Sequence, residues 1–258
     1  MSGPELQLTR TDGVLRLVID RPKQRNALSA QVLNGMQEAL GSLEPQDRVV
    51  LVASSGDEVF CSGADLAMMS RDATGLELHE ARGALRRLIL TMRALPLPVV
   101  GRVQGRCLAG GVGLALGCDL VVASAQAQFE LPEVKRGLWP FMVSGLLAQH
   151  VSPKIAMDMM LTGAPMSAQR AAELGLVSRV VDAAELDTQV EALLAQLAGS
   201  APVAMRRGKA AFAAAQETAL EPALEALQAQ LSLLTQTDDV AEGLAAFFDK
   251  REPRWTGR

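Results

Sequence analysis

The sequence predicts an α/β fold that ends in a helical region, and three observations lead to this prediction. Short apolar segments with the length of buried strands alternate with segments of helical length over about the first 200 residues. From about residue 201 the chain is rich in Ala and Leu, with Glu and Gln between them. Of the 258 residues 49% are hydrophobic, so the chain is long enough and apolar enough to enclose a core.

The first predicted element is a β-hairpin. Segment 6–10 alternates between apolar and polar residues, Asp12-Gly13 is typical of a tight turn, and 14–19 is a second apolar strand. Ser29 is well placed to cap a helix that runs to about Leu40, because its hydroxyl can accept a hydrogen bond from a free backbone N–H.

A strand, a long helix and a second strand are predicted next. Segment 49–53 is short and fully apolar, as expected of a buried strand. The helix over about 77–95 ends at Pro96 and Pro98, because proline lacks the N–H that would continue it. Segment 99–103 has the pattern of another buried strand.

The rest of the chain alternates in the same way before it becomes helical. A glycine-rich stretch over 105–117 leads into an apolar strand at 120–123. Short helices are predicted from there to residue 161, and a last strand at 177–181. From about residue 184 onward we expect helix with little interruption.

Composition excludes several classes of function. A net charge of −4 argues against nucleic acid as the main partner, since that needs clustered positive charge. Only two histidines and no tyrosine are present, which argues against Ser-His-Asp catalysis and against histidine metal sites, so we expect no metal. Three cysteines without CxxC spacing, Cys61, Cys107 and Cys118, indicate buried reduced thiols.

The sequence shows neither a membrane-spanning segment nor a secretion signal. The sequence has no uncharged apolar run of about 18 residues, which a membrane-spanning helix would need. It also lacks a basic start followed by an apolar stretch. We therefore expect a cytoplasmic protein that does not bind membranes.

The glycine-rich stretch has two interpretations. Residues 111–117 fit a loose GxGxxxG, but the next predicted strand follows too soon for a dinucleotide-binding helix, and no acidic residue ends that strand at the required spacing. Alternatively, glycine lets backbone N–H groups approach a ligand and form an oxyanion hole. The turn at 60–66, where Asp65 is suited to cap a following helix, would supply a second donor. Two ordinary tight turns would give the same pattern.

Four segments together resemble the crotonase superfamily, the enoyl-CoA hydratases and isomerases. Segments 60–66 and 105–120 resemble its two signatures, 22–28 is similar to its loop on the CoA side, and 242–251 resembles its C-terminal end. The four segments occur in the family's order and span nearly the whole chain.

The resemblance implies a fold and an assembly. Residues 1–200 would form a spiral of ββα turns that binds acyl-CoA, and 201–258 a helical oligomerisation region. Trimers or dimers of trimers are the usual assembly of the family. Coenzyme A is part of the substrate, so no separate cofactor is expected.

The resemblance also implies site residues. The N–H groups of Ala64 and Gly110 would bind the thioester oxygen as it becomes enolate-like, and Glu133 would transfer the proton. Phe247 and Lys250 would reach the ligand of a neighbouring subunit. The positions that match substrate-binding residues are Lys23, Ala27, Ser62, Asp65, Leu66, Phe247 and Lys250. For any single lysine, an ordinary solvated surface position is the alternative.

The sequence departs from the hydratases of this family at one acid. Those enzymes use two glutamates, and the position of the first is Gly113, while a third acidic position used by dienoyl-CoA isomerases is Phe141. One carboxylate that removes a proton at one carbon and returns it at another describes a double-bond isomerase. Glu133 follows Pro132, however, and that pair is also common where a helix begins.

Alternative functions remain open at this point. The protein could be a hydratase despite Gly113, or an acyl-CoA-binding protein without catalysis. RNA binding, which occurs in a family relative, is disfavoured by the acidic charge and by the lack of a lysine-rich helix.

Bulky side chains follow Glu133. Trp139 and Phe141 predict a restricted acyl pocket, with Met68 and Met69 as an adaptable wall, although core packing would explain the same residues. These apolar side chains around Glu133 would raise the pKa of its carboxyl group.

Overall fold

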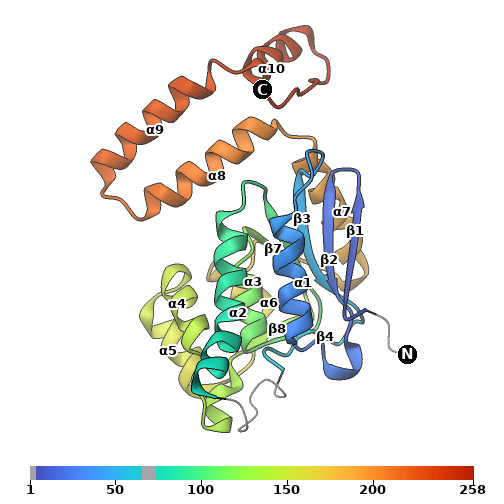
Figure 1. Ribbon diagram of the computed structural model, residues 1–258, viewed down its shortest axis with the longest axis vertical. Helices are drawn as coiled ribbons and strands as arrows, with labels where there is room; N and C mark the ends of the chain where they lie inside the picture. Colours follow the sequence, from blue (N-terminus) through green and yellow to red (C-terminus); the bar gives the residue numbers. More distant parts are fainter. Residues whose placement is uncertain (1–3, 66–73) are drawn as a thin grey trace.

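A computed structural model describes residues 4–65 and 74–258 of the chain (Figure 1). The predicted hairpin is present: β1 (Leu6–Thr11) pairs antiparallel with β2 (Val14–Ile19). Asp12 and Gly13 turn the chain with φ angles of 54° and 77°, the positive values that a tight hairpin turn needs. This hairpin begins the larger of two sheets.

The larger sheet has six strands in the order β1-β2-β3-β5-β7-β10. From β2 onward all neighbouring strands are parallel. The added strands are β3 (Val49–Ser54), β5 (Val99–Val103), β7 (Leu120–Ser124) and β10 (Arg179–Val181). The four predicted strands are confirmed, and only the last begins later than predicted, at residue 179 instead of 177.

A second sheet has four very short strands in the order β4-β6-β8-β9. They are β4 (Val59–Cys61), β6 (Arg106–Leu108), β8 (Gln128–Glu130) and β9 (Met166–Ser167). None of these strands is predicted from the sequence, because two or three residues are too few to show an alternating pattern.

The chain winds as a spiral in which two strands and a helix repeat. Strand β3 enters the larger sheet, β4 the smaller one, and α2 (Gly75–Ala94) follows. The same order recurs for β5, β6 and α3 (Gly110–Leu116), and for β7, β8 and α4 (Phe141–His150). This arrangement confirms the predicted α/β fold with a spiral of ββα turns.

Side-chain caps define where two long helices start. Ser29 Oγ accepts a hydrogen bond from Val32 N over 3.2 Å and starts α1 (Ala30–Gly41), as predicted. Thr74 and Glu77 form a reciprocal capping box that starts α2 two residues before the predicted position. The remaining elements before the C-terminal region are η1 (Pro22–Gln24), η3 (Pro132–Arg136), α5 (Pro153–Thr162), α6 (Ala168–Glu173), η4 (Ala183–Glu185) and α7 (Leu186–Ala198).

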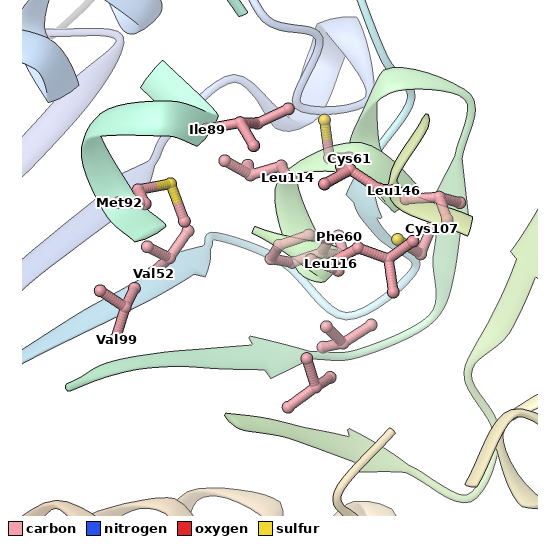
Figure 2. Packing of buried hydrophobic residues seen from close by; sticks show 14 of the residues in the cluster. Val52, Phe60, Cys61, Ile89, Met92, Val99, Cys107, Leu114, Leu116 and Leu146 are labelled. Carbon is pink, nitrogen blue, oxygen red and sulfur yellow. The ribbon is translucent and has the colours of Figure 1, made fainter. Parts of the chain in front are cut away.

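The larger sheet buries both of its faces. Alternate residues of β3 point to opposite sides: Val49 and Leu51 pack in a cluster with α7, whereas Val50 and Val52 belong to the main core with α1 and α2. Figure 2 shows Phe60 with the apolar side chains of this main core. The resulting rigid framework positions the loops at the ends of β4 and β6.

Two of the three cysteines lie inside this core, as predicted. Cys61 and Cys107 are buried among apolar side chains (Figure 2), and Cys118 is partly buried. All three are free thiols. Burial raises the pKa of Cys61 to about 12, so this thiol stays protonated and unreactive at neutral pH.

The C-terminal region consists of α8 (Pro202–Gln216), α9 (Leu220–Leu234) and α10 (Asp238–Asp249), which project from the body (Figure 1). The prediction of nearly continuous helix is wrong for residues 250–258. Lys250 ends α10 with a φ angle of 54°, and Pro253 prevents a new helical turn. The final segment packs back instead: Trp255 Nε1 donates a hydrogen bond to the Gly199 carbonyl over 2.7 Å.

One lysine connects α8 to the body. Lys209 Nζ lies 2.6 Å from Asp119 Oδ2 and also donates hydrogen bonds to the carbonyls of Met92 and Leu97. Among residues 4–65 and 74–258, no helix has both the length and the apolar character needed to cross a membrane.

Candidate active site

A large cavity of about 1310 Å³ lies where the loops of the spiral meet. Its walls come from the loop after β2, the turn after β4, helix α2, the start of α3, and the segment from η3 into α4. Most of the predicted site residues therefore come together although they lie up to 114 positions apart in the sequence, from Ala27 to Phe141.

The turn after β4 is held by the loop that precedes α1. Leu28 N donates to the Gly63 carbonyl over 2.8 Å, and Asp65 N donates to the Leu28 carbonyl over 3.1 Å. Asp65 also forms an ion pair with Arg21, whose Nη2 lies 2.9 Å from Asp65 Oδ2. These contacts position Ala64 between two anchored neighbours.

This turn contacts the start of α3 directly. Gly63 has a φ angle of 92°, and a Cβ atom added there would lie 2.8 Å from Ala109 Cβ and 2.9 Å from Gly110 N. A Cβ added at Gly110 would in turn lie 3.5 Å from Ala64 N. The absence of side chains at both glycines lets the two backbone segments approach each other.

Ala109 orients the first peptide of α3 through an unusual conformation. Its φ and ψ angles are 53° and −124°, a combination that costs a residue with a side chain about 1–3 kcal/mol. Ala109 N donates to the Glu130 carbonyl over 2.9 Å, and Val112 N donates to the Ala109 carbonyl over 3.0 Å, so neighbouring elements hold it in place.

Two backbone donors are left free at the cavity. Neither Ala64 N nor Gly110 N donates a hydrogen bond to another described residue. Both residues line the cavity. Ala64 is exposed and Gly110 is partly exposed at the cavity, so both N–H groups are accessible to an oxygen atom of a ligand.

Glu133 places a carboxylate with one unpartnered oxygen at the same cavity. It lies in η3, is partly buried, and its Oε2 atom is buried without a hydrogen-bond partner among the described residues. Burial raises the pKa of this carboxyl above its ordinary value of 4.5, while a backbone hydrogen bond and Arg136 partly oppose the increase. A proton acceptor that faces a cavity in this way is suited to proton transfer.

The short helix that bears Glu133 is anchored by a charged network. Lys135 Nζ donates to the Gly163 carbonyl and lies 3.4 Å from Glu130 Oε1. Glu130 Oε2 lies 2.7 Å from Arg106 Nη2. These contacts connect η3 to β6, to β8 and to the end of α5.

Gly113 is buried in α3, and the space beside it is filled. A Cβ added there would lie 3.2 Å from Val143 Cγ2 and 3.7 Å from Ile89 Cδ1. Val143 is itself part of the cavity wall, whereas Gly113 is not. An apolar side chain from α4 therefore occupies the position beside Gly113.

The other predicted residues fall into three groups. Five more of them line the cavity together with Glu133 and the two donors: Ala27, Ser62, Asp65, Trp139 and Phe141. Lys23 is exposed on η1 and does not line it, and Phe247 and Lys250 are exposed on and just after α10. Leu66, Met68, Met69 and the helix that Asp65 was expected to cap lie outside the described residues.

The cavity wall also contains basic residues that are not predicted from the sequence. His79, Arg82 and Arg86 come from one face of α2, Arg25 comes from a loop, and Arg136 ends η3. Their spacing along α2 is helical, but the same spacing is typical of an ordinary solvated helix face, and only the fold places that face beside the cavity.

Two strands and a helix that repeat around such a cavity define the crotonase class of proteins. A profile of the enoyl-CoA hydratase/isomerase family matches residues 9–258, and the chain belongs to that family. It is thus a crotonase-type enzyme.

Individual relatives cover nearly the whole chain. It is 34% identical to enoyl-CoA hydratase domain-containing protein 3 of Rattus norvegicus, over 99% of this chain and 86% of that one. It is 32% identical to carnitinyl-CoA dehydratase of Proteus mirabilis, over 98% of both chains. The crystal structure of an enoyl-CoA hydratase from Mycobacterium smegmatis superimposes with a TM-score of 0.93 at 34% identity, covering 98% of this chain and 99% of that one.

Proposed function

We propose that this enzyme moves the double bond of an unsaturated acyl-CoA thioester, with Glu133 as its only proton-transferring group. The observation that supports this proposal is that Oε2 of Glu133 has no hydrogen-bond partner among the described residues, while the apolar side chain of Val143 lies beside Gly113. A cavity with one free carboxylate and two free backbone donors matches the needs of an enolate mechanism.

The reaction begins with removal of a proton. The Glu133 carboxylate takes a proton from the carbon next to the thioester of a β,γ-unsaturated substrate, and the electron pair of that C–H bond moves into the thioester group. The negative charge that develops on the thioester oxygen accepts hydrogen bonds from Ala64 N and Gly110 N. One such preorganised donor is worth about 3–4 kcal/mol of the barrier.

The same carboxyl group completes the reaction. The electrons return from the enolate, the double bond shifts next to the thioester, and the γ-carbon takes the proton from Glu133. Glu133 is a carboxylate again at the end, so atoms and charge balance without a second acid. The raised pKa suits this role, because the group must both accept and release a proton.

Hydration makes an additional demand that this cavity does not meet with a carboxylate. A water molecule must be held and activated beside the substrate, and the hydratases of this family use a second glutamate for this purpose. Gly113 has no side chain, and Val143 fills the adjacent space. Hydration is the second candidate function, favoured by the hydratase and dehydratase names of the relatives.

A comparison of two substrates separates these functions. We expect purified protein to convert a β,γ-unsaturated acyl-CoA to its α,β isomer, and to hydrate crotonyl-CoA at least about a hundredfold more slowly, because one proton-transferring group contributes about that factor. Both products are quantified by chromatography and mass spectrometry. Fast hydration of crotonyl-CoA without isomerisation of the other substrate would replace this proposal with the hydratase function. Binding without turnover of either would favour a non-catalytic protein.

We also propose that α8 to α10 assemble the protein into trimers or dimers of trimers. These helices expose many large apolar side chains, among them Phe212, Leu220, Leu231, Phe247 and Phe248. Phe247 and Phe248 each expose 76% of their surface, which is unusual for a chain that stays monomeric. Size-exclusion chromatography with light scattering is expected to give three or six chains per particle. Replacement of Phe247 and Phe248 by Ser is expected to shift the protein toward monomers. A monomeric wild-type protein would contradict this assembly.

A further inference from the structure

Helix α2 presents a row of basic side chains to the active-site cavity. His79, Arg82 and Arg86 are three and four residues apart, so they lie on one face of the helix, and all three line the cavity. Each is exposed, and none forms a hydrogen bond or an ion pair with another residue in the described part of the chain. The charges of the two arginines are therefore available to a ligand.

Positive charge is concentrated at this cavity against the trend of the whole chain. The chain has a net charge of −4, yet five arginines line the cavity: Arg25, Arg82, Arg86, Arg87 and Arg136. The carboxylates in the same wall are Asp65, Glu80 and Glu133, and Asp65 is already paired with Arg21. This excess of positive charge would attract an anionic ligand.

The arginines of α2 lie close to the two backbone donors. Leu85 Cδ2 is 3.1 Å from the position of a Cβ at Gly110, so this point of α2 is beside the donor pair. Arg86 follows Leu85 directly, and Arg82 is three residues away, about 4.5 Å along the helix axis. Both residues thus lie within one helical turn of Leu85, the point at which α2 contacts the start of α3.

This placement distinguishes the acyl group from coenzyme A. When the thioester oxygen accepts hydrogen bonds from Ala64 and Gly110, the long pantetheine arm separates the phosphates of coenzyme A from that point. The acyl group, in contrast, is attached directly to the bound carbonyl. An anion that reaches Arg82 and Arg86 is therefore one that the acyl chain itself bears.

We propose that the preferred substrates are thioesters of dicarboxylic acids, whose terminal carboxylate binds Arg82 and Arg86. The inference rests on the proposed acyl-CoA function of this site. A guanidinium group binds a carboxylate through two parallel hydrogen bonds, which gives both affinity and orientation. Trp139, Phe141 and Val143 line the cavity and would contact the methylene groups between the two ends.

Binding of two saturated thioesters of equal length tests the inference without any need for turnover. Adipoyl-CoA and hexanoyl-CoA differ only in the terminal group, and neither has a double bond to move or hydrate. We expect adipoyl-CoA to bind at least about tenfold more tightly in a calorimetric titration, the effect of one charge-assisted hydrogen bond. The double variant Arg82→Gln/Arg86→Gln is expected to lose this difference by weakening adipoyl-CoA alone.

Another arginine of α2, Arg93, provides the control for this test. Arg93→Gln changes an arginine of the same helix that does not line the cavity, so it is expected to keep the difference. Equal or tighter binding of hexanoyl-CoA to the wild type would overturn the inference and leave the proposed function intact. Equal weakening of both thioesters and of free coenzyme A in the double variant would assign the arginines to the phosphates instead. Failure of the wild type to bind either thioester would refute the inference together with the proposed function.

Discussion

Replacement of Glu133 by Gln is expected to lower the turnover number for double-bond migration by about 10²–10⁴-fold, the usual contribution of a general base. The substitution keeps the size of the side chain and removes only its ability to accept a proton. Because Oε2 has no hydrogen-bond partner among the described residues, no protein contact of that atom is lost. Thioester binding, measured by titration with a saturated acyl-CoA, should be unchanged.

Stability gives an independent readout of the same variant. Burial raises the pKa of Glu133 in the folded protein, so the folded state binds this proton more tightly than the unfolded state. The stabilisation that comes from protonated Glu133 is complete at pH values below the ordinary pKa of 4.5. It is lost as the pH rises through the raised pKa of Glu133 in the folded protein. At neutral pH we therefore expect Glu133→Gln to melt at the same temperature as the wild type or higher.

The pH dependence of the wild-type enzyme should report the same carboxyl group. The base must be ionised to accept a proton, so kcat/KM should fall as the pH decreases through the pKa of Glu133, at a pH above the ordinary glutamate range. Glu38→Gln is a matched control, because Glu38 is an exposed glutamate of α1 outside the cavity. Unchanged turnover in Glu133→Gln would remove this residue from the mechanism.

Replacement of Gly63 by Ala is expected to have the second large effect, because it should impair both folding and catalysis. An alanine there would have to adopt a φ angle of 92° with its Cβ 2.8 Å from Ala109 Cβ and 2.9 Å from Gly110 N. Conformational strain and overpacking together should lower the free energy of unfolding by about 2–4 kcal/mol. Displacement of the Gly110 donor should reduce the turnover number of the remaining folded enzyme by about 10²–10³-fold.

A second glycine provides the control for this variant. Gly145 lies inside α4, and a Cβ added there meets no atom within 4 Å. Gly145→Ala should therefore stabilise the protein by about 0.5–1 kcal/mol through helix propensity. Urea unfolding and steady-state kinetics of both variants make the comparison. A stable and fully active Gly63→Ala enzyme would show that the close approach of the two turns is not needed.

Local signals in the sequence were sufficient for most of the larger sheet and for the first helices. The Asp12-Gly13 turn, the Ser29 cap and Pro96 act over a few residues, so their effects can be predicted without the fold. The strands of the smaller sheet could not be predicted, because they have only two or three residues and are defined by partners far away in the chain. The nonhelical C-terminal segment likewise depends on tertiary contacts of Trp255.

The candidate site likewise has features that the local sequence predicts and features that only the fold determines. Motifs led to Ala64, Gly110 and Glu133, and all three line one cavity. Long-range packing decides the properties that matter chemically. Val143 beside Gly113 is thirty positions away in the sequence, and the arginines of α2 resemble those of any solvated helix until the fold places them at the cavity.

The central claim is that Glu133 forms an enolate of the bound thioester, and exchange of the α-protons in heavy water measures this step most directly. A saturated thioester such as butyryl-CoA has no double bond to move, so uptake of deuterium next to its carbonyl reports proton removal alone. Mass spectrometry is expected to show deuterium uptake with the wild-type enzyme and none above the uncatalysed rate with Glu133→Gln. Equal exchange by both proteins, or no exchange by the wild type, would contradict the proposed mechanism.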